Sequence, residues 1–183
     1  MACVAVGELT QDRLESMRNF SLTACVAVVC LSFTGTAKAQ DATLPPPSQH
    51  PVLTVQGRGV QIYGCQEAAG RFQWTFVAPA ARLFDGDREV GTHGDGPVWN
   101  AEDGSSIHGQ LVAKSPSPDP GAIPWLLLKG VNPSRSGVLS TVEFIRRSET
   151  QGGIAPATGC DSEHVRDLAR VPYTATYTFY SSK

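Results

Sequence analysis

The segment Val171–Tyr180 limits the possible folds of this chain more than any other part of the sequence. Apolar and aromatic residues alternate there with threonines, and the apolar set is Tyr173, Ala175, Tyr177 and Phe179. Successive side chains of a strand point to opposite faces. The alternation therefore predicts a strand with one face in an aromatic core, which requires partner strands.

Short β-rich runs of the same kind recur along the chain, separated by turn residues. Gly (18) and Pro (13) are frequent while charged residues make up only 17%, which favours many tight turns over long helices. Asp85-Gly86-Asp87 and Asp103-Gly104 are typical of hairpin turns, because Asp-Gly tolerates positive φ. The expected strands are Val52–Val55, Gly59–Cys65, Phe72–Val77, Arg82–Phe84, Glu89–His93, Pro97–Asn100, Ser105–Ala113, Pro124–Lys129, Val138–Arg147 and Val171–Tyr180.

Tight turns between consecutive strands favour antiparallel pairing. We therefore predict an all-β fold, an antiparallel β-sandwich or barrel-like domain of about nine or ten strands. Pro124–Lys129 is apolar on both faces, as expected of a central strand covered on both sides. Only Asp161–Leu168 is predicted to be helical, over about two turns.

The first 39 residues have the pattern of a secretory signal peptide. Arg18 supplies a positive charge, Leu22–Phe33 an apolar stretch, and Ala37-Lys38-Ala39 a small-x-small cleavage site. The apolar stretch is shorter than the roughly 20 residues that span a bilayer, so no membrane span is expected. Met17 is the expected start, because the residues before it carry acidic side chains. The protein is therefore predicted to be secreted or periplasmic.

Removal of this leader would leave a Pro-rich tether over residues 40–50 and a single β domain over residues 51–183. Cys3, Cys25 and Cys30 lie in the leader, so the domain keeps two cysteines, Cys65 and Cys160. In an oxidising compartment these two are expected to form a disulfide, the alternative being two free buried thiols.

The charge of the chain excludes one class of partner. The formal net charge is -2 and no cluster of Lys or Arg could neutralise several phosphates. Nucleic acid is therefore not an expected partner.

Several longer motifs resemble a known family. They are Gly59-Val60-Gln61-Ile62-Tyr63-x-Cys65, Trp74-x-Phe76-x-x-Pro79-x-Ala81-x-Leu83-Phe84-Asp85, Gly91-Thr92-His93-x-x-Gly96-Pro97-x-Trp99, Asp103-Gly104-Ser105, Ile123-Pro124-Trp125-Leu126-Leu127-Leu128, Thr150-x-Gly152-Gly153-x-Ala155-Pro156, Gly159-Cys160 and Val171-Pro172-Tyr173. Together they cover nearly the whole domain, and the chain resembles the DUF3455 family of uncharacterised bacterial and fungal proteins. The resemblance implies no established activity and no catalytic residues.

Some fungal relatives carry a malate dehydrogenase label, which the residues of this chain contradict. A nicotinamide site needs a glycine-rich turn that leads from a strand into a helix. Gly57-x-Gly59 is followed by Ile62 where the third glycine should stand, and no helix is expected after it.

Polar residues are densest between Asp85 and His108, where we expect a site if the protein has one. His93-x-Asp95 would place two potential metal ligands on one face of an extended segment, with His108 on the adjoining hairpin. The alternative is that His93, beside a glycine in a turn, only bonds a backbone group.

Aromatic residues allow a binding role. Trp99 follows the Gly96-Pro97 corner in this polar region and could contact a ligand, whereas the other large aromatic residues are expected in the core. The candidate binding residues are His93, Asp95, Trp99, Asp103 and His108, and no catalytic residue, metal ligand or cofactor is assigned.

The sequence thus favours a ligand-binding or surface-interaction module whose partner is a small molecule, a carbohydrate or a surface component. The alternative is a small extracellular enzyme, a metal-dependent hydrolase centred on His93 and Asp103. Convergence of His93, Asp95 and His108 would favour the enzyme, and an aromatic groove without them would favour binding.

Overall fold

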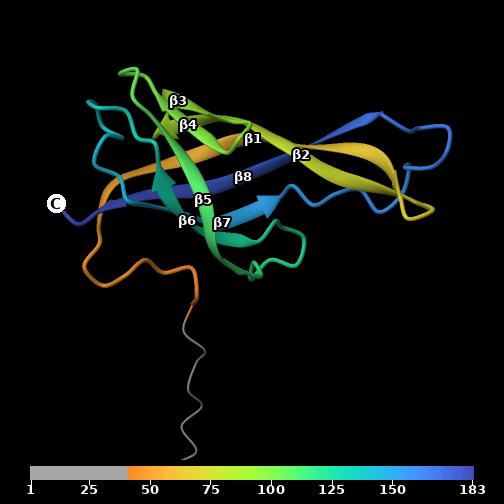
Figure 1. Ribbon diagram of the computed structural model, residues 1–183, viewed down its shortest axis with the longest axis horizontal. Helices are drawn as coiled ribbons and strands as arrows, with labels where there is room; N and C mark the ends of the chain where they lie inside the picture. Colours follow the sequence, from red (N-terminus) through yellow and green to blue (C-terminus); the bar gives the residue numbers. More distant parts are fainter. Residues whose placement is uncertain (1–40) are drawn as a thin grey trace, which may run out of the picture. The chain divides into compact units, whose positions relative to one another are not determined.

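The computed structural model describes residues 41–183, so the predicted signal peptide over residues 1–39, the predicted start at Met17 and Cys3, Cys25 and Cys30 lie outside the described residues. Within residues 41–183, eight strands follow one another (Figure 1). They are β1 (His50–Ala68), β2 (Arg71–Asp85), β3 (Arg88–Gly94), β4 (Val98–Ala101), β5 (Ser106–Ser115), β6 (Trp125–Val131), β7 (Phe144–Gly152) and β8 (Leu168–Ser181).

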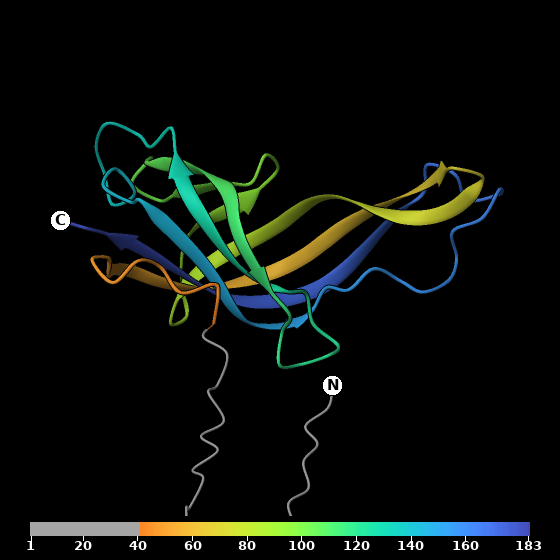
Figure 2. The same cartoon turned by 60° about the horizontal axis from the view of Figure 1, so that its bottom comes forward.

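Each strand pairs antiparallel with the next, and β8 pairs with β1, so the sheet closes into a barrel-like ring. This confirms the predicted all-β antiparallel class. β1, β2 and β8 continue beyond the other strands (Figure 2). Residues 64–75 and 154–168 make up this extension, which we call the arm.

The strands number eight rather than nine or ten because two expected breaks are absent. Val52–Val55 and Gly59–Cys65 both belong to β1, which runs straight through Gly57 and Gly59. A Cβ on Gly57 would lie 2.6 Å from the ring of Tyr177, and one on Gly59 would lie 2.2 Å from the carbonyl oxygen of Ala80. These glycines therefore permit close approach of neighbouring groups and do not mark turns.

The second break was expected in β2, between Phe72–Val77 and Arg82–Phe84. β2 passes through Pro79, which has no N–H to donate. β3 pairs with β2 only over Ala81–Asp85, so this missing donor removes no bond to β3.

The predicted helix over Asp161–Leu168 is wrong, because this segment consists of turns that lead into β8. Asp161 Oδ1 accepts hydrogen bonds from the Glu163 backbone N–H and from His164 Nδ1, which favours a local turn over a helix. The backbone of Cys65 also bonds the segment at Arg166 and Asp167, and so holds it beside β1.

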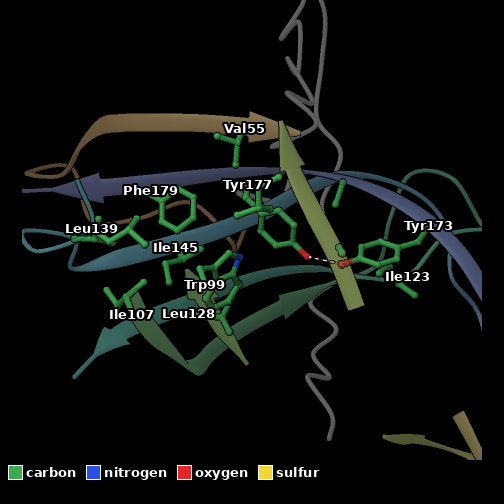
Figure 3. Packing of buried hydrophobic residues seen from close by; sticks show 14 residues of the cluster. Val55, Trp99, Ile107, Ile123, Leu128, Leu139, Ile145, Tyr173, Tyr177 and Phe179 are labelled. Carbon is green, nitrogen blue, oxygen red and sulfur yellow. Dashed lines mark hydrogen bonds between the residues drawn. The ribbon is translucent and has the colours of Figure 1, made fainter. Parts of the chain in front are cut away.

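The inner face of the ring forms the core, shown in Figure 3. The predicted alternation of β8 is confirmed, since Tyr173, Ala175, Tyr177 and Phe179 are all buried in this core. In β6, the adjacent residues Leu127 and Leu128 are both buried. Adjacent strand residues face opposite sides, so both faces of β6 are covered, as expected.

The expected tether over residues 40–50 is attached to the ring at its beginning. Arg146 Nη2 donates to Asp41 Oδ2 at 2.6 Å, and Thr43 is fully buried. Pro46 and Pro47 are exposed, as expected of a solvated stretch. Gln49 Nε2 donates to Glu143 Oε2, so the segment is held against the ring at its end as well.

Cys65 and Cys160 form the predicted disulfide, with their Cα atoms 5.3 Å apart. The bridge joins β1 to the segment that precedes β8, and both ends lie in the arm. Over residues 41–183, no helix has the length and apolar character needed to cross a membrane.

Candidate functional site

A cavity of about 500 Å³ opens into the ring on the side of β2, β5 and β6. Its walls are mostly apolar, with a few polar groups among them. The residues that matter most for its chemistry are Phe76, His93, Trp99, Leu126, Arg147 and Tyr177.

The strand register explains why these side chains meet. His93 on β3 lies directly opposite Trp99 on β4, and Arg147 on β7 lies directly opposite Tyr177 on β8. Leu126 on β6 is the other cross-strand neighbour of Arg147. Opposed residues of an antiparallel pair share a face, so these residues all point into the ring.

His93 and Trp99 stack with ring centroids 4.2 Å apart and an angle of 11° between their planes. His93 Nδ1 lies 2.9 Å from the carbonyl oxygen of Val98. A carbonyl can only accept, so Nδ1 carries the proton and Nε2 is the acceptor of the neutral ring.

Burial lowers the pKa of His93 from 6.5 to about 4, and the positive charge of Arg147 acts in the same direction. The hydrogen bond to Val98 opposes these two effects and is outweighed. The ring is therefore neutral at pH 7, and it presents an aromatic surface instead of a charge.

Two tyrosines carry polar atoms into the same core. The hydroxyl oxygens of Tyr173 and Tyr177 lie 3.1 Å apart, as the dashed line in Figure 3 marks. Burial raises the pKa of both phenols, so both hydroxyls stay protonated.

Arg147 is the single cation among the cavity's lining residues. Its Nε and Nη2 donate to the carbonyl oxygen of Pro124 at 3.1 and 2.8 Å. No carboxylate of residues 41–183 forms an ion pair with it. Its positive charge lowers the pKa of His93 and partly offsets the effect of burial on the pKa of Tyr177.

Sequence reasoning missed Arg147, although a signal for it exists. Residues two apart on a strand share a face. In the expected strand Val138–Arg147, the apolar Ile145 predicts an inward face that Arg147, two positions later, shares, and the structure does bury Ile145 fully.

The candidate residues from the sequence separate into three places. His93, Asp95 and Trp99 line the cavity. His108 points outward from β5, where its Nδ1 lies 3.3 Å from the carbonyl oxygen of Gly96. Asp103 lies in the turn after β4 and accepts bonds from the Ser105 hydroxyl at 2.6 Å and from the backbone N–H of Val138 at 2.7 Å.

Among residues 41–183, this arrangement does not bring His93, Asp95 and His108 together as metal ligands, nor does it place Asp103 beside His93. His93 faces inward and His108 outward, while Asp103 follows the far end of β4 from Trp99, the partner of His93. Within the part of the chain that the structure describes, no three His, Cys, Asp or Glu side chains are placed to hold a metal ion.

The mouth of the cavity is lined by apolar side chains that remain in contact with solvent. Phe76 is 51% exposed, Leu111 57% and Val77 47%. A cluster of large exposed apolar residues around a cavity is typical of a surface that something else covers.

Comparison with protein families shows to which family the chain is related. The profile described as "Protein of unknown function (DUF3455)" matches residues 45–90 and 86–181. The chain belongs to the DUF3455 family. Comparison with curated proteins found no match, and comparison with solved structures found none. Since the DUF3455 description states no activity, the function has to be argued from the cavity.

The dehydrogenase label of some DUF3455 relatives finds no counterpart in the structure. Gly57 and Gly59 lie inside β1, and the chain continues as strand until Ala68. A dinucleotide needs such glycines at a turn before a helix N-terminus.

Proposed function

We propose that this DUF3455 domain is a binding module that holds a small, largely apolar molecule in the cavity of the ring. The observation that carries the proposal is the cavity itself, about 500 Å³ with apolar walls and few polar groups. Ligand sites of proteins typically measure about 300 to 1,000 Å³ and have this composition.

The aromatic side chains support this reading. Trp99 and Tyr177 meet edge to face with centroids 5.6 Å apart, and His93 stacks on Trp99. Their positions are fixed by packing, so the cavity wall is formed before a ligand arrives. Rigid walls lower the entropic cost of binding.

The experiment is a titration of the purified protein with Nile red, an uncharged apolar dye whose fluorescence rises in apolar surroundings. We expect saturable binding with one site. Absence of saturable binding would contradict the proposal.

A matched pair of variants locates the dye. Leu111 and Val112 are adjacent exposed residues of β5, and only Leu111 lines the cavity. Leu111→Ser should weaken Nile red binding by roughly three- to tenfold, because about 1 kcal/mol of apolar contact is lost. Val112→Ser should leave the affinity unchanged, and equal effects of the two variants would place the dye elsewhere.

We also propose that the domain acts outside the cytoplasm, in the periplasm or in the medium. The predicted leader and the Cys65–Cys160 disulfide support this, because disulfides persist in oxidising compartments. Intact mass and N-terminal sequencing of the native protein should give a chain that begins at Gln40 without free thiols. A chain in the cytosol with Cys65 and Cys160 open to alkylation would contradict the proposal.

A further inference from the structure

We infer that the ligand carries a carboxylate, which binds between Arg147, Lys114 and Gln61 while its apolar body lies toward Trp99. The inference rests on the proposed function and adds to it the chemical class of the ligand. It is carried by a second hollow in the ring, by the position of two cations and by a buried amide that lacks a partner.

The second hollow, of about 340 Å³, adjoins the cavity. Phe76, Leu126 and Arg147 line both spaces, so one molecule can reach from one to the other along this shared wall. Gln61 and Lys114 line only the second hollow, and His93 and Trp99 only the first.

The strand register holds the two cations on the same face. Lys114 on β5 is opposite Leu126 on β6, and Leu126 is opposite Arg147 on β7. Cross-strand neighbours share a face, so both cations flank Leu126 on the inner side of the sheet. Within residues 41–183 neither cation is paired with a carboxylate.

Gln61 supplies a donor without a partner. The residue is only 2% exposed, and its Nε2 forms no hydrogen bond of normal geometry, although the amide lies close enough to the Tyr173 hydroxyl to lower the pKa of that phenol. A buried donor without a partner costs about 1 to 3 kcal/mol. A carboxylate oxygen in the second hollow would offset this cost.

The chemistry of Arg147 favours a carboxylate over other polar groups. A guanidinium has five donor hydrogens in a planar fork that fits the two oxygens of a carboxylate. The bonds to Pro124 use only Nε and Nη2, so donors remain for a ligand. Asp95, which lines the first cavity, would repel an anion there and so sets the orientation of the ligand.

The test compares 2-naphthoate with 2-naphthamide, which has the same shape without the charge. Isothermal titration calorimetry of the purified protein should show the carboxylate binding at least about tenfold more tightly, as expected for a charge-assisted bond in a partly buried site. Arg147→Met should abolish this preference and leave the naphthamide affinity largely unchanged.

Two further variants keep the test decisive if Arg147→Met does not fold, since Arg147 also bonds Pro124. Gln61→Glu should reduce binding of naphthoate by tenfold or more through charge repulsion and spare naphthamide. Lys114→Gln should lower the preference by about threefold, because an exposed charge is screened by solvent. Lys129→Gln, an exposed lysine of β6 outside both spaces, is the control and should change nothing.

The outcomes separate this inference from the proposed function. If Nile red binds at Leu111 but naphthoate binds no more tightly than naphthamide, the carboxylate inference is wrong and the binding function stands. If the preference survives in the folded variants of Arg147, Gln61 and Lys114, the anion lies elsewhere and the inference is wrong. If Nile red does not bind, the proposed function is wrong.

Discussion

The two halves of the ring interior are built from the same strands but are packed differently. In one half, Val55, Ile107, Ile145 and Phe179 fill the space and are fully or almost fully buried. In the other half, the side chains surround a cavity and include a guanidinium. The difference indicates that the filled half supplies most of the stability, whereas the hollow half is where we propose that a ligand binds.

The filled half and the hollow half meet within two residues along a strand. On β7, Ile145 belongs to the filled half and Arg147 to the hollow half. On β8, Phe179 and Tyr177 make the same change, and Trp99 touches both of them with centroid distances of 6.2 and 5.6 Å. Trp99 and Tyr177 thus belong both to the packed core, where Figure 3 shows them, and to the cavity wall.

The largest expected effect compares one phenylalanine from each half. Phe179 is 0% exposed and Phe76 is 51% exposed. Phe179→Ala should lower the free energy of unfolding by about 3 to 5 kcal/mol, because it leaves a void in a packed core. Phe76→Ala should cost less than about 1 kcal/mol, since its ring is half in solvent. Urea unfolding measures both, and similar losses would refute the division into a filled and a hollow half.

The next effect concerns the arm, which lies outside both halves. Cys65→Ser with Cys160→Ser removes the bridge over a sequence separation of 95 residues. We expect the free energy of unfolding to fall by about 2 to 4 kcal/mol, mainly because the unfolded chain gains freedom.

Near-ultraviolet circular dichroism of the folded double variant checks that the cavity survives. The signal of the aromatic stack should be retained, because both cysteines lie in the arm. If the double variant were folded but lacked that signal, the arm would also determine the structure of the hollow half.

A third prediction uses the buried His93, which is 4% exposed. Its pKa is about 4 in the folded protein and about 6.5 in the unfolded chain. Between these values the unfolded chain binds a proton that the folded protein does not. This contribution to stability is therefore complete above pH 6.5 and decreases as the pH falls toward 4, by about 3 kcal/mol in all.

Urea unfolding at several pH values measures this slope. His93→Gln keeps a donor for the Val98 carbonyl but does not titrate, so its stability should fall less steeply over the same range. If the free energy of unfolding depended on pH in the same way for the variant and the native protein, burial would not lower the pKa of His93, and the prediction would be wrong.

The smallest effect should come from His108, on the outer face of β5. His108→Ala is expected to change the free energy of unfolding by less than about 0.5 kcal/mol and to leave Nile red affinity unchanged. A clear loss of binding would restore His108 as a site residue.

Much of the fold could be predicted from the sequence. The alternation in β8, the Asp-Gly hairpins and the two cysteines left after the leader predicted strands, turns and the bridge from local rules. Those rules failed where distant groups decide the structure. Gly57 and Gly59 look like turn residues until Tyr177 and Ala80 are seen beside them, and the helix expected at Asp161–Leu168 is replaced by contacts to Cys65.

Less of the candidate site could be read from the sequence. His93, Asp95 and Trp99, which line the cavity, are close in sequence and share a hairpin. Arg147, Gln61 and Lys114 come from β7, β1 and β5, and only the closing of the ring brings them near Trp99. A pattern within one segment cannot reveal such a combination.

The pairing of β1 with β8 also affects how quickly the protein can fold. They are the first and the last strands of residues 41–183, so their pairing has to close a loop that contains all the other strands. Folds dominated by such distant pairings reach the native state in roughly milliseconds to seconds. Cys65 lies on β1 and Cys160 shortly before β8. Once the disulfide has formed, it keeps these two strands close together even in the unfolded chain, so that their pairing no longer requires a long-range encounter.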